Sequence, residues 1–182
     1  LEIQTIDGNH YIAIAVPLTG PYKQLGNSIV EGSNLAVEEF NTSEASRNHR
    51  IGTMIIDDGG LVSEALARAD LVIAQHCLGV IGHLNSEISI EASKKYSQAG
   101  IVEISPASTS PKLTDRPEVK GYVYRTIGTD TQLGEVAAAY IKTNEKYKKI
   151  ALLYNDRPYG VSVSSEFSKS LAKDPSKEIV LH

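Results

Sequence analysis

The chain has 182 residues, of which 41% are hydrophobic, and its net charge is −4. These values suit a globular protein with a buried core and argue against nucleic acid as a partner, because no basic cluster is present. No apolar run approaches the roughly 20 residues that a membrane-spanning helix needs, and the lone Cys77 excludes a disulfide within the chain.

Strands and helices alternate through the first hundred residues. Apolar, β-branched runs predict strands at 11–16, 51–56, 78–81 and 101–104. Apolar residues at helical spacing predict helices at about 27–41, 63–76 and 86–98. This order predicts an α/β fold, with a doubly wound parallel sheet, right-handed crossovers and helices on both faces.

The pattern changes after Pro117. Strands are predicted at 122–127, 150–154 and 178–181, with helices at about 131–143 and 161–173. We therefore expect a first lobe at 1–128 and an incomplete second α/β lobe at 129–182. The second lobe is expected to bury too little area to stand alone. It either docks onto the first sheet, or its other half is missing from this chain.

Two polar loops follow neighbouring predicted strands. One is Gly-His-Leu-Asn-Ser at 82–86, and the other is Ser-Pro-Ala-Ser-Thr-Ser-Pro at 105–111. In an open parallel sheet both loops emerge at the carboxyl edge, where such folds bind ligands. They offer hydroxyl and backbone N–H groups and no carboxylate–histidine set, so we expect them to hold a small polar molecule without transforming it.

The chemistry of these loops favours a zwitterionic α-amino acid. Ser86 is expected at a helix N-terminus, where the helix dipole favours a carboxylate. Ser108 and Thr109 add hydroxyl groups, and the loop carbonyls can accept an ammonium. The alternative is that Ser86 is only a helix cap and that residues 108–110 form only a turn.

Other candidates carry less weight. The Asp57-Asp58 pair follows a strand and could hold a metal or a phosphoryl group, as in receiver domains, but Ser105-Pro106 stands where a receiver would carry a lysine. We therefore expect these aspartates to shape a turn. His83 has no acidic neighbour in the loop, which favours a structural hydrogen bond. Tyr159 is either an aromatic wall of a site or a surface turn residue.

Residues 80–86 and 104–114 together resemble the leucine/isoleucine/valine-type substrate-binding proteins of ABC importers. The likeness extends in order over nearly the whole chain, through residues 17–21, 24–26, 36–41, 57–58, 124–126 and 159–160. The resemblance implies a type I periplasmic binding fold, in which two α/β lobes close around a ligand through a hinge. Family members are longer, so the chain resembles the N-terminal lobe plus the start of the second.

The resemblance also implies roles for individual residues. Ser86 and Thr109 would bind the ligand carboxylate and ammonium, and Ser108 would offer its carbonyl. The pocket would be lined by Leu84, Asn85 and Leu25, with Tyr159 as an aromatic wall from the second lobe. Two departures stand out: Leu25 replaces an aromatic residue found in many members, and the disulfide that some members carry between the positions of Gly60 and Asn85 is absent.

The function expected from the resemblance is solute binding for an ABC importer, outside the cytoplasm in the periplasm or the extracellular space. The ligand would be an amino acid or a similar polar solute, the partner an ABC permease, and no cofactor or catalysis is expected. Association of copies through the incomplete second lobe is a further expectation. Two alternatives stay open: a ligand-sensing ectodomain of a receptor or kinase-linked protein, and a small α/β enzyme or receiver that uses Asp57-Asp58.

Overall fold

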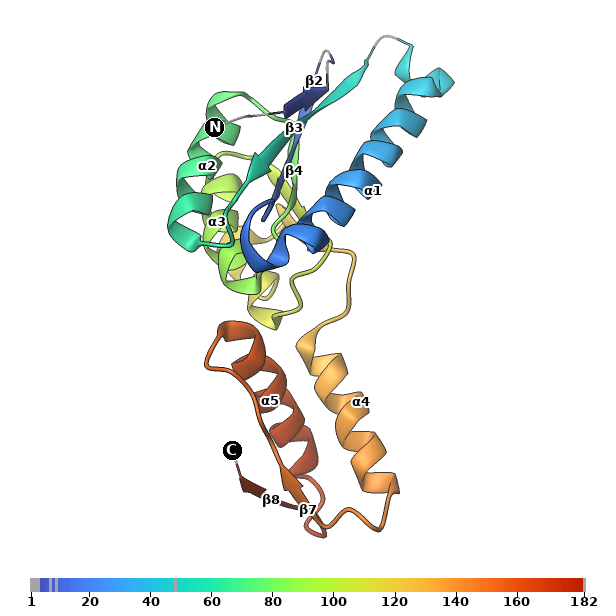
Figure 1. Ribbon diagram of the computed structural model, residues 1–182, viewed down its shortest axis with the longest axis vertical. Helices are drawn as coiled ribbons and strands as arrows, with labels where there is room; N and C mark the ends of the chain where they lie inside the picture. Colours follow the sequence, from blue (N-terminus) through green and yellow to red (C-terminus); the bar gives the residue numbers. More distant parts are fainter. Residues whose placement is uncertain (1–3, 7, 9, 48, 182) are drawn as a thin grey trace. The chain divides into compact units, whose positions relative to one another are not determined.

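The computed structural model describes residues 4–6, 8, 10–47 and 49–181, which fold into two compact units. The first unit runs up to Ser108 and includes Lys112–Ile127. The second unit comprises Thr109–Pro111 and the chain from Gly128 onward. Each unit is described by itself (Figure 1).

The first unit is built on a six-stranded sheet with the order β1-β3-β2-β4-β5-β6. Its strands are β1 (Gln4–Ile6), β2 (His10–Val16), β3 (Ile51–Asp57), β4 (Gly79–Gly82), β5 (Val102–Ser105) and β6 (Val123–Arg125). All neighbours pair in parallel except β1, which runs antiparallel to β3. The sequence pattern did not predict β1, because three residues are too few to show a period.

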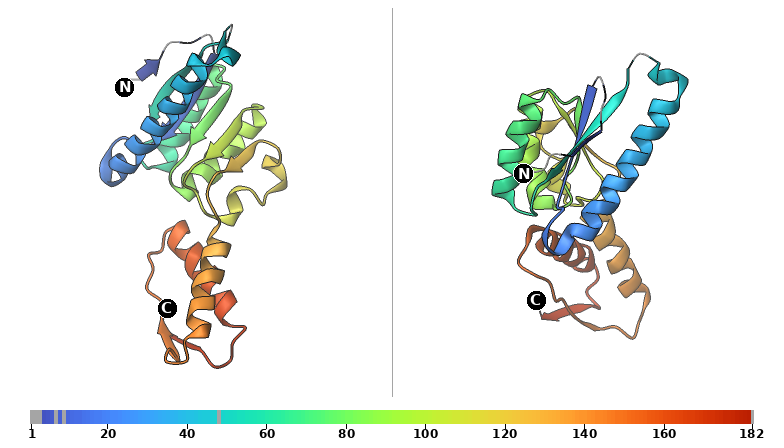
Figure 2. Two further views of the ribbon diagram at one scale, coloured as in Figure 1. Left: turned by 90° about the vertical axis from the view of Figure 1, so that its right-hand side faces the viewer. Right: turned by 45° about the horizontal axis from the view of Figure 1, so that its top comes forward.

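Helices cover both faces of this sheet. They are α1 (Lys23–Thr42), α2 (Val62–Ala74) and α3 (Ser86–Gln98), with short 3-10 turns η1 (Gly20–Tyr22), η2 (Glu44–Ser46), η3 (Pro111–Leu113) and η4 (Pro117–Val119). α1 lies on one face, and α2 and α3 lie on the other (Figures 1 and 2). The predicted doubly wound α/β fold is confirmed, although α1 begins four residues before its predicted start at residue 27.

Alternating residues of β2 divide the core between the two faces. Ala13 and Ala15 pack in the cluster that includes residues of α2 and α3, where Cys77 is also buried. Ile14 and Val16 point the other way and pack with residues of α1. A strand buried on both faces reads as a continuous apolar run, which is why its sequence predicts a central parallel strand.

The second unit contains α4 (Asp130–Thr143), α5 (Pro158–Leu171) and the parallel strands β7 (Lys149–Ala151) and β8 (Glu178–Leu181). Its core consists of Ala138, Phe167 and Leu171. Figure 2 shows the two helices next to the short strands. β7 ends at Ala151, three residues before the predicted end at residue 154, so residues 152–154 are not strand.

Candidate functional site

The two polar loops emerge next to each other from the first unit. β4 ends at Gly82 and β5 ends at Ser105, and these strands are parallel neighbours in the sheet. Gly82 has a φ of 154°, and a Cβ at this position would collide with the Ala15 carbonyl oxygen on β2. Only glycine therefore allows the chain to leave β4 along this path.

Hydrogen bonds to one carbonyl oxygen join the two loops. The Ser105 hydroxyl donates to the His83 carbonyl oxygen over 2.8 Å, and the Ser108 hydroxyl lies 3.2 Å from the same oxygen. The Ser89 hydroxyl of α3 also reaches this oxygen, at 3.2 Å. These bonds fix the loop after β4 against the loop after β5.

The residues of the first loop lie at the N-terminus of α3. Asn85 occupies the cap position, but its side chain makes no capping bond, and its Oδ1 is buried without a hydrogen-bond partner. Ser86 is the first residue of the helix and is buried, so the alternative that Ser86 is the helix cap is wrong. Leu84 is partly buried, and its carbonyl oxygen lies 3.3 Å from the Ser108 hydroxyl.

Ser108 is fully buried and hydrogen-bonded within the protein. Its N–H already donates to the Ser105 hydroxyl, over 3.0 Å. Its carbonyl accepts from the Arg125 guanidinium over 3.1 Å. The positive charge of Arg125 opposes a second cation there. Ser108 is thus hydrogen-bonded within the protein through its hydroxyl, its N–H and its carbonyl.

Thr109 follows Ser108 in the chain and groups with the second unit. Its carbonyl accepts the Asp130 N–H at the start of α4 over 2.9 Å. The Thr109 hydroxyl oxygen is buried without a hydrogen-bond partner. A buried hydroxyl normally has a partner, so this group is available to a polar ligand.

Leu25 and Tyr159 are the most exposed of the predicted site residues. Leu25 lies on α1 and is 56% exposed. Tyr159 lies in the second unit, at the start of α5, and is 49% exposed.

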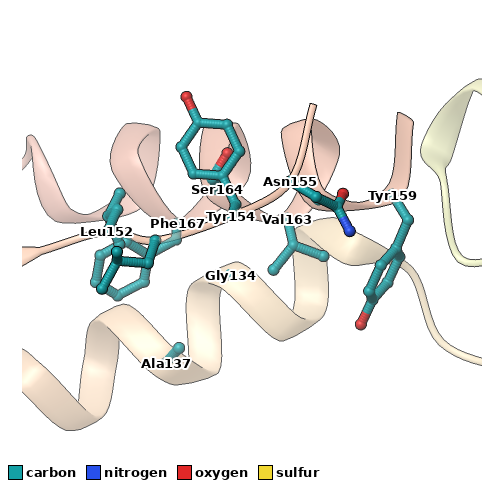
Figure 3. A pocket seen from close by; sticks show the side chains of 11 residues that line it. Gly134, Ala137, Leu152, Tyr154, Asn155, Tyr159, Val163, Ser164 and Phe167 are labelled. Atoms are coloured by element: carbon teal, nitrogen blue, oxygen red, sulfur yellow. The ribbon is translucent and has the colours of Figure 1, made fainter. Parts of the chain in front are cut away.

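Tyr159 lines a pocket of about 480 Å³ within the second unit. Figure 3 shows Tyr159 and Asn155 at one end of this pocket and Leu152 and Phe167 at the other. Ala137 and Gly134 of α4 form part of the wall. The lining is largely apolar, with a few polar groups near Tyr159.

The aspartates after β3 shape a turn, as expected, but they also reach neighbouring loops. Asp57 accepts the Gly59 N–H at 2.9 Å, the Leu18 N–H at 2.8 Å and the Thr19 hydroxyl at 2.7 Å. Burial tends to raise the pKa of Asp57, but these donors outweigh burial and hold the pKa below its ordinary value. Asp57 thereby ties the loop after β2 to the turn after β3.

The structural hydrogen bond expected of His83 is confirmed, but its partner is an aspartate from another part of the chain. His83 Nδ1 lies 2.7 Å from Asp58 Oδ2, and both side chains are fully buried. The two residues are 25 positions apart, so only the fold brings them together. This carboxylate–histidine pair has no surface exposed to a substrate. Among the residues that the structure describes, no group of three or more His, Cys, Asp or Glu side chains is arranged to hold a metal ion.

Comparison with known proteins supports the fold. The family model described as "Periplasmic binding protein" matches residues 10–180. The chain belongs to the periplasmic binding protein family. It is 35% identical over 167 residues to Leu/Ile/Val-binding protein homolog 1 of Brucella abortus, covering 92% of this chain and 44% of that protein. It is also 33% identical over 162 residues to the leucine-, isoleucine-, valine-, threonine- and alanine-binding protein of Pseudomonas aeruginosa, covering 88% of this chain and 42% of that protein.

Solved structures of periplasmic binding proteins give the same result. An ABC transporter substrate-binding protein of Desulfitobacterium hafniense, solved in complex with Leu, is 31% identical with a TM-score of 0.78, and the match covers 94% of this chain and 49% of that one. A leucine-binding protein of Thermotoga maritima, 22% identical, shares the fold with a TM-score of 0.84, over 95% of this chain and 48% of that one. The chain thus spans about half the length of the relatives it matches.

Proposed function

We propose that this chain contributes part of the binding surface for a branched-chain or similar amino acid in an ABC import system. The observation that carries the proposal is the pair of loops after β4 and β5, held together by hydrogen bonds to the His83 carbonyl. The names of relatives from Brucella and Pseudomonas, and the Leu complex of the Desulfitobacterium protein, support this ligand class.

The two ends of the amino acid would be held by different groups. The first turn of α3, with Ser86 and the unpartnered Asn85 Oδ1 beside it, would face the ligand backbone, with the helix dipole favouring the carboxylate. The Thr109 hydroxyl would bond the ligand. Leu84, Leu25 and Tyr159 would contact its side chain. Ser108 would hold the loop, because its hydroxyl and carbonyl are already bonded.

The proposed partner is an ABC permease, and the proposed location is outside the cytoplasm, in the periplasm or the extracellular space. Both follow from membership in the periplasmic binding protein family. In the described part of the chain, no helix combines the length and apolar character of a membrane span. No finding favours the receptor alternative.

The second unit offers a surface for association between copies of this chain. Leu153 is 87% exposed, and Val136 and Tyr140, one turn apart on α4, are 70% and 62% exposed. Adjacent exposed apolar side chains favour association. Light scattering should therefore show a mass above that of the monomer, and Leu153→Lys should lower it. A monomeric mass at every concentration would contradict this proposal.

Binding is tested on the 182-residue chain with 15N-labelled protein and rising concentrations of L-leucine. The chain spans 44% of its Brucella relative, so we expect it to supply only part of the contacts and to bind weakly. Amide signals of residues 84–89, 105 and 107–109 should shift in a saturable way. Two solutes serve as controls: D-leucine, which has the opposite chirality, and glycerol, which carries no charge. Equal shifts with all three solutes, or none with L-leucine, would overturn the proposal.

A further inference from the structure

A chain of buried polar side chains lies directly behind the two ligand loops. His83 Nδ1 lies 2.7 Å from Asp58 Oδ2, and His83 Nε2 lies 3.2 Å from the Tyr96 hydroxyl. All three residues have no exposed surface. Buried polar groups are costly unless each has a partner, and here both ring nitrogens of His83 have one.

The direction of each hydrogen bond follows from the chemistry of the partners. A carboxylate only accepts, so Nδ1 of His83 carries a hydrogen that it donates to Asp58. Burial, with a further contribution from the Glu103 and Asp58 carboxyl groups, raises the pKa of Tyr96 well above its ordinary value. Tyr96 therefore keeps its proton, and its hydroxyl donates a hydrogen bond to Nε2. This fixes the ring of His83 in one tautomer.

Both ends of this chain are anchored in the frame of the first unit. Asp58 Oδ1 accepts the Gly60 N–H over 2.9 Å, and the Asp58 N–H donates to the Val16 carbonyl over 3.1 Å. Tyr96 belongs to the core cluster shared by the sheet and α3. The ring of His83 is thus tied to the turn after β3, while its main-chain carbonyl is tied to the loop after β5 through Ser105 and Ser108.

We infer that His83 is a positioning residue: the Asp58–His83–Tyr96 chain sets the spacing between the N-terminus of α3 and the loop after β5. His83 cannot touch a ligand, because it is fully buried. Its side chain is held by Asp58, and its carbonyl holds the hydroxyls of Ser105, Ser108 and Ser89. This inference rests on the proposed function of the two loops. It means that the buried Asp58–His83–Tyr96 chain, which does not touch the ligand, affects how well the loops bind an α-carboxylate.

Paired variants test the inference in the 182-residue chain. Asp58→Asn removes the carboxylate that anchors the ring, whereas Asp57→Asn changes the adjacent residue, whose bonds go to Leu18, Thr19 and Gly59. Tyr96→Phe removes only the hydroxyl bonded to Nε2. Tyr11→Phe is its matched control, since Tyr11 packs against the same core cluster.

The first measurement needs no ligand. Long-range 1H–15N spectra of the free chain should show the Nδ1–H tautomer of His83, which Asp58→Asn should disturb. Amide shifts of residues 84–86 and 107–108 should move in Asp58→Asn and Tyr96→Phe and stay in place in Tyr11→Phe. In Asp57→Asn the movement should centre on the loop after β2. If loop shifts in folded Asp58→Asn and Tyr96→Phe match those of the parent chain, the inference is wrong.

The second measurement uses ligand selectivity, which a purely structural role would not alter. Affinity for L-leucine should fall about tenfold in Asp58→Asn, while affinity for L-leucinamide, which lacks the carboxylate, should change less. Equal losses for both ligands, or none, would contradict the inference. If the parent chain fails to respond to leucine, the proposed function fails, and the ligand-free spectra still decide the role of His83. If Asp58→Asn does not fold, the comparison of L-leucine with L-leucinamide is made with His83→Asn and Tyr96→Phe. The asparagine side chain at position 83 keeps a hydrogen-bond donor toward Asp58.

Discussion

The hydroxyl groups of Ser89 and Ser108 lie 2.6 Å apart and join α3 to the loop after β5. Ser108 Oγ also lies within hydrogen-bond distance of the His83 and Leu84 carbonyl oxygens. Ser108→Ala should therefore lower the free energy of unfolding of the first unit by about 1–3 kcal/mol, since it leaves buried partners unsatisfied. Urea denaturation followed by circular dichroism measures this change. Ser97→Ala, which removes a hydroxyl from a partly buried helix position, should have a much smaller effect.

Removing the Thr109 hydroxyl should not lower stability as removing the Ser108 hydroxyl does, because the buried Thr109 hydroxyl oxygen has no hydrogen-bond partner in the protein. Thr109→Val keeps the shape of the side chain and removes that hydroxyl. We expect unchanged or slightly higher stability, together with weaker binding of L-leucine, by about tenfold for one lost hydrogen bond. Urea titration and the amide-shift titration measure the two effects separately. A variant that loses stability and binds as the parent does would contradict the assignment of Thr109 to the ligand.

Glu103 on β5 should make stability fall as the pH rises. Its side chain is fully buried. Burial raises its pKa well above the ordinary 4.5, although the His83 main-chain N–H and then the charge of Arg116 oppose this. Below pH 4.5 the carboxyl is protonated in both the folded and unfolded chain. Above that pH the carboxyl group ionises first in the unfolded chain, which stabilises the unfolded state. The free energy of unfolding therefore declines until the carboxyl group of the folded chain also ionises.

Glu103→Gln tests this prediction, because an amide stays neutral at every pH. Relative to the parent, the variant should gain stability as the pH rises above 4.5 in a series of urea denaturation curves. Glu166→Gln is a control of opposite sign, since a hydrogen bond from Lys169 lowers the pKa of Glu166. A Glu103→Gln variant whose stability runs parallel to that of the parent from pH 4 to pH 8 would show that Glu103 ionises normally.

Gly134 allows α4 and α5 to approach closely in the second unit. A Cβ at this position would lie 2.6 Å from the Phe167 main-chain nitrogen and 2.7 Å from the Glu166 carbonyl carbon. Gly134→Ala should force the helices apart and destabilise this unit by about 1–3 kcal/mol. Hydrogen exchange of the α4 and α5 amides measures the loss. Gly32→Ala on α1, where a Cβ meets nothing within 4 Å, should instead be neutral or stabilising, and an equal response at both glycines would rule out the close-packing explanation.

The central strands and the helices between them were predictable because their patterns are local. The run at 11–16 is buried on both faces and reads as a parallel strand without further information. The ends of elements were less predictable: α5 begins at Pro158 rather than at residue 161, because proline fits the first turn of a helix. β7 stops at Ala151, although the apolar pattern continues to residue 154.

The position of the candidate site in the sheet was predictable, but its hydrogen-bond network was not. Strand ends place loops 82–86 and 105–111 at one edge, which sequence order alone indicates. The pairing of Asp58 with His83 crosses 25 residues, and no local pattern reports such a contact. The same holds for Arg125 on β6, the strand that pairs with β5. Its guanidinium donates a hydrogen bond to the Ser108 carbonyl.

The bond from the Ser105 hydroxyl to the His83 carbonyl has a kinetic consequence. Loops that are already fastened present the same shape to every arriving molecule, so encounter with this surface needs no slow rearrangement of these loops. Different amino acids should then meet it at similar association rates. Their residence times, rather than their rates of capture, should decide which one the protein retains.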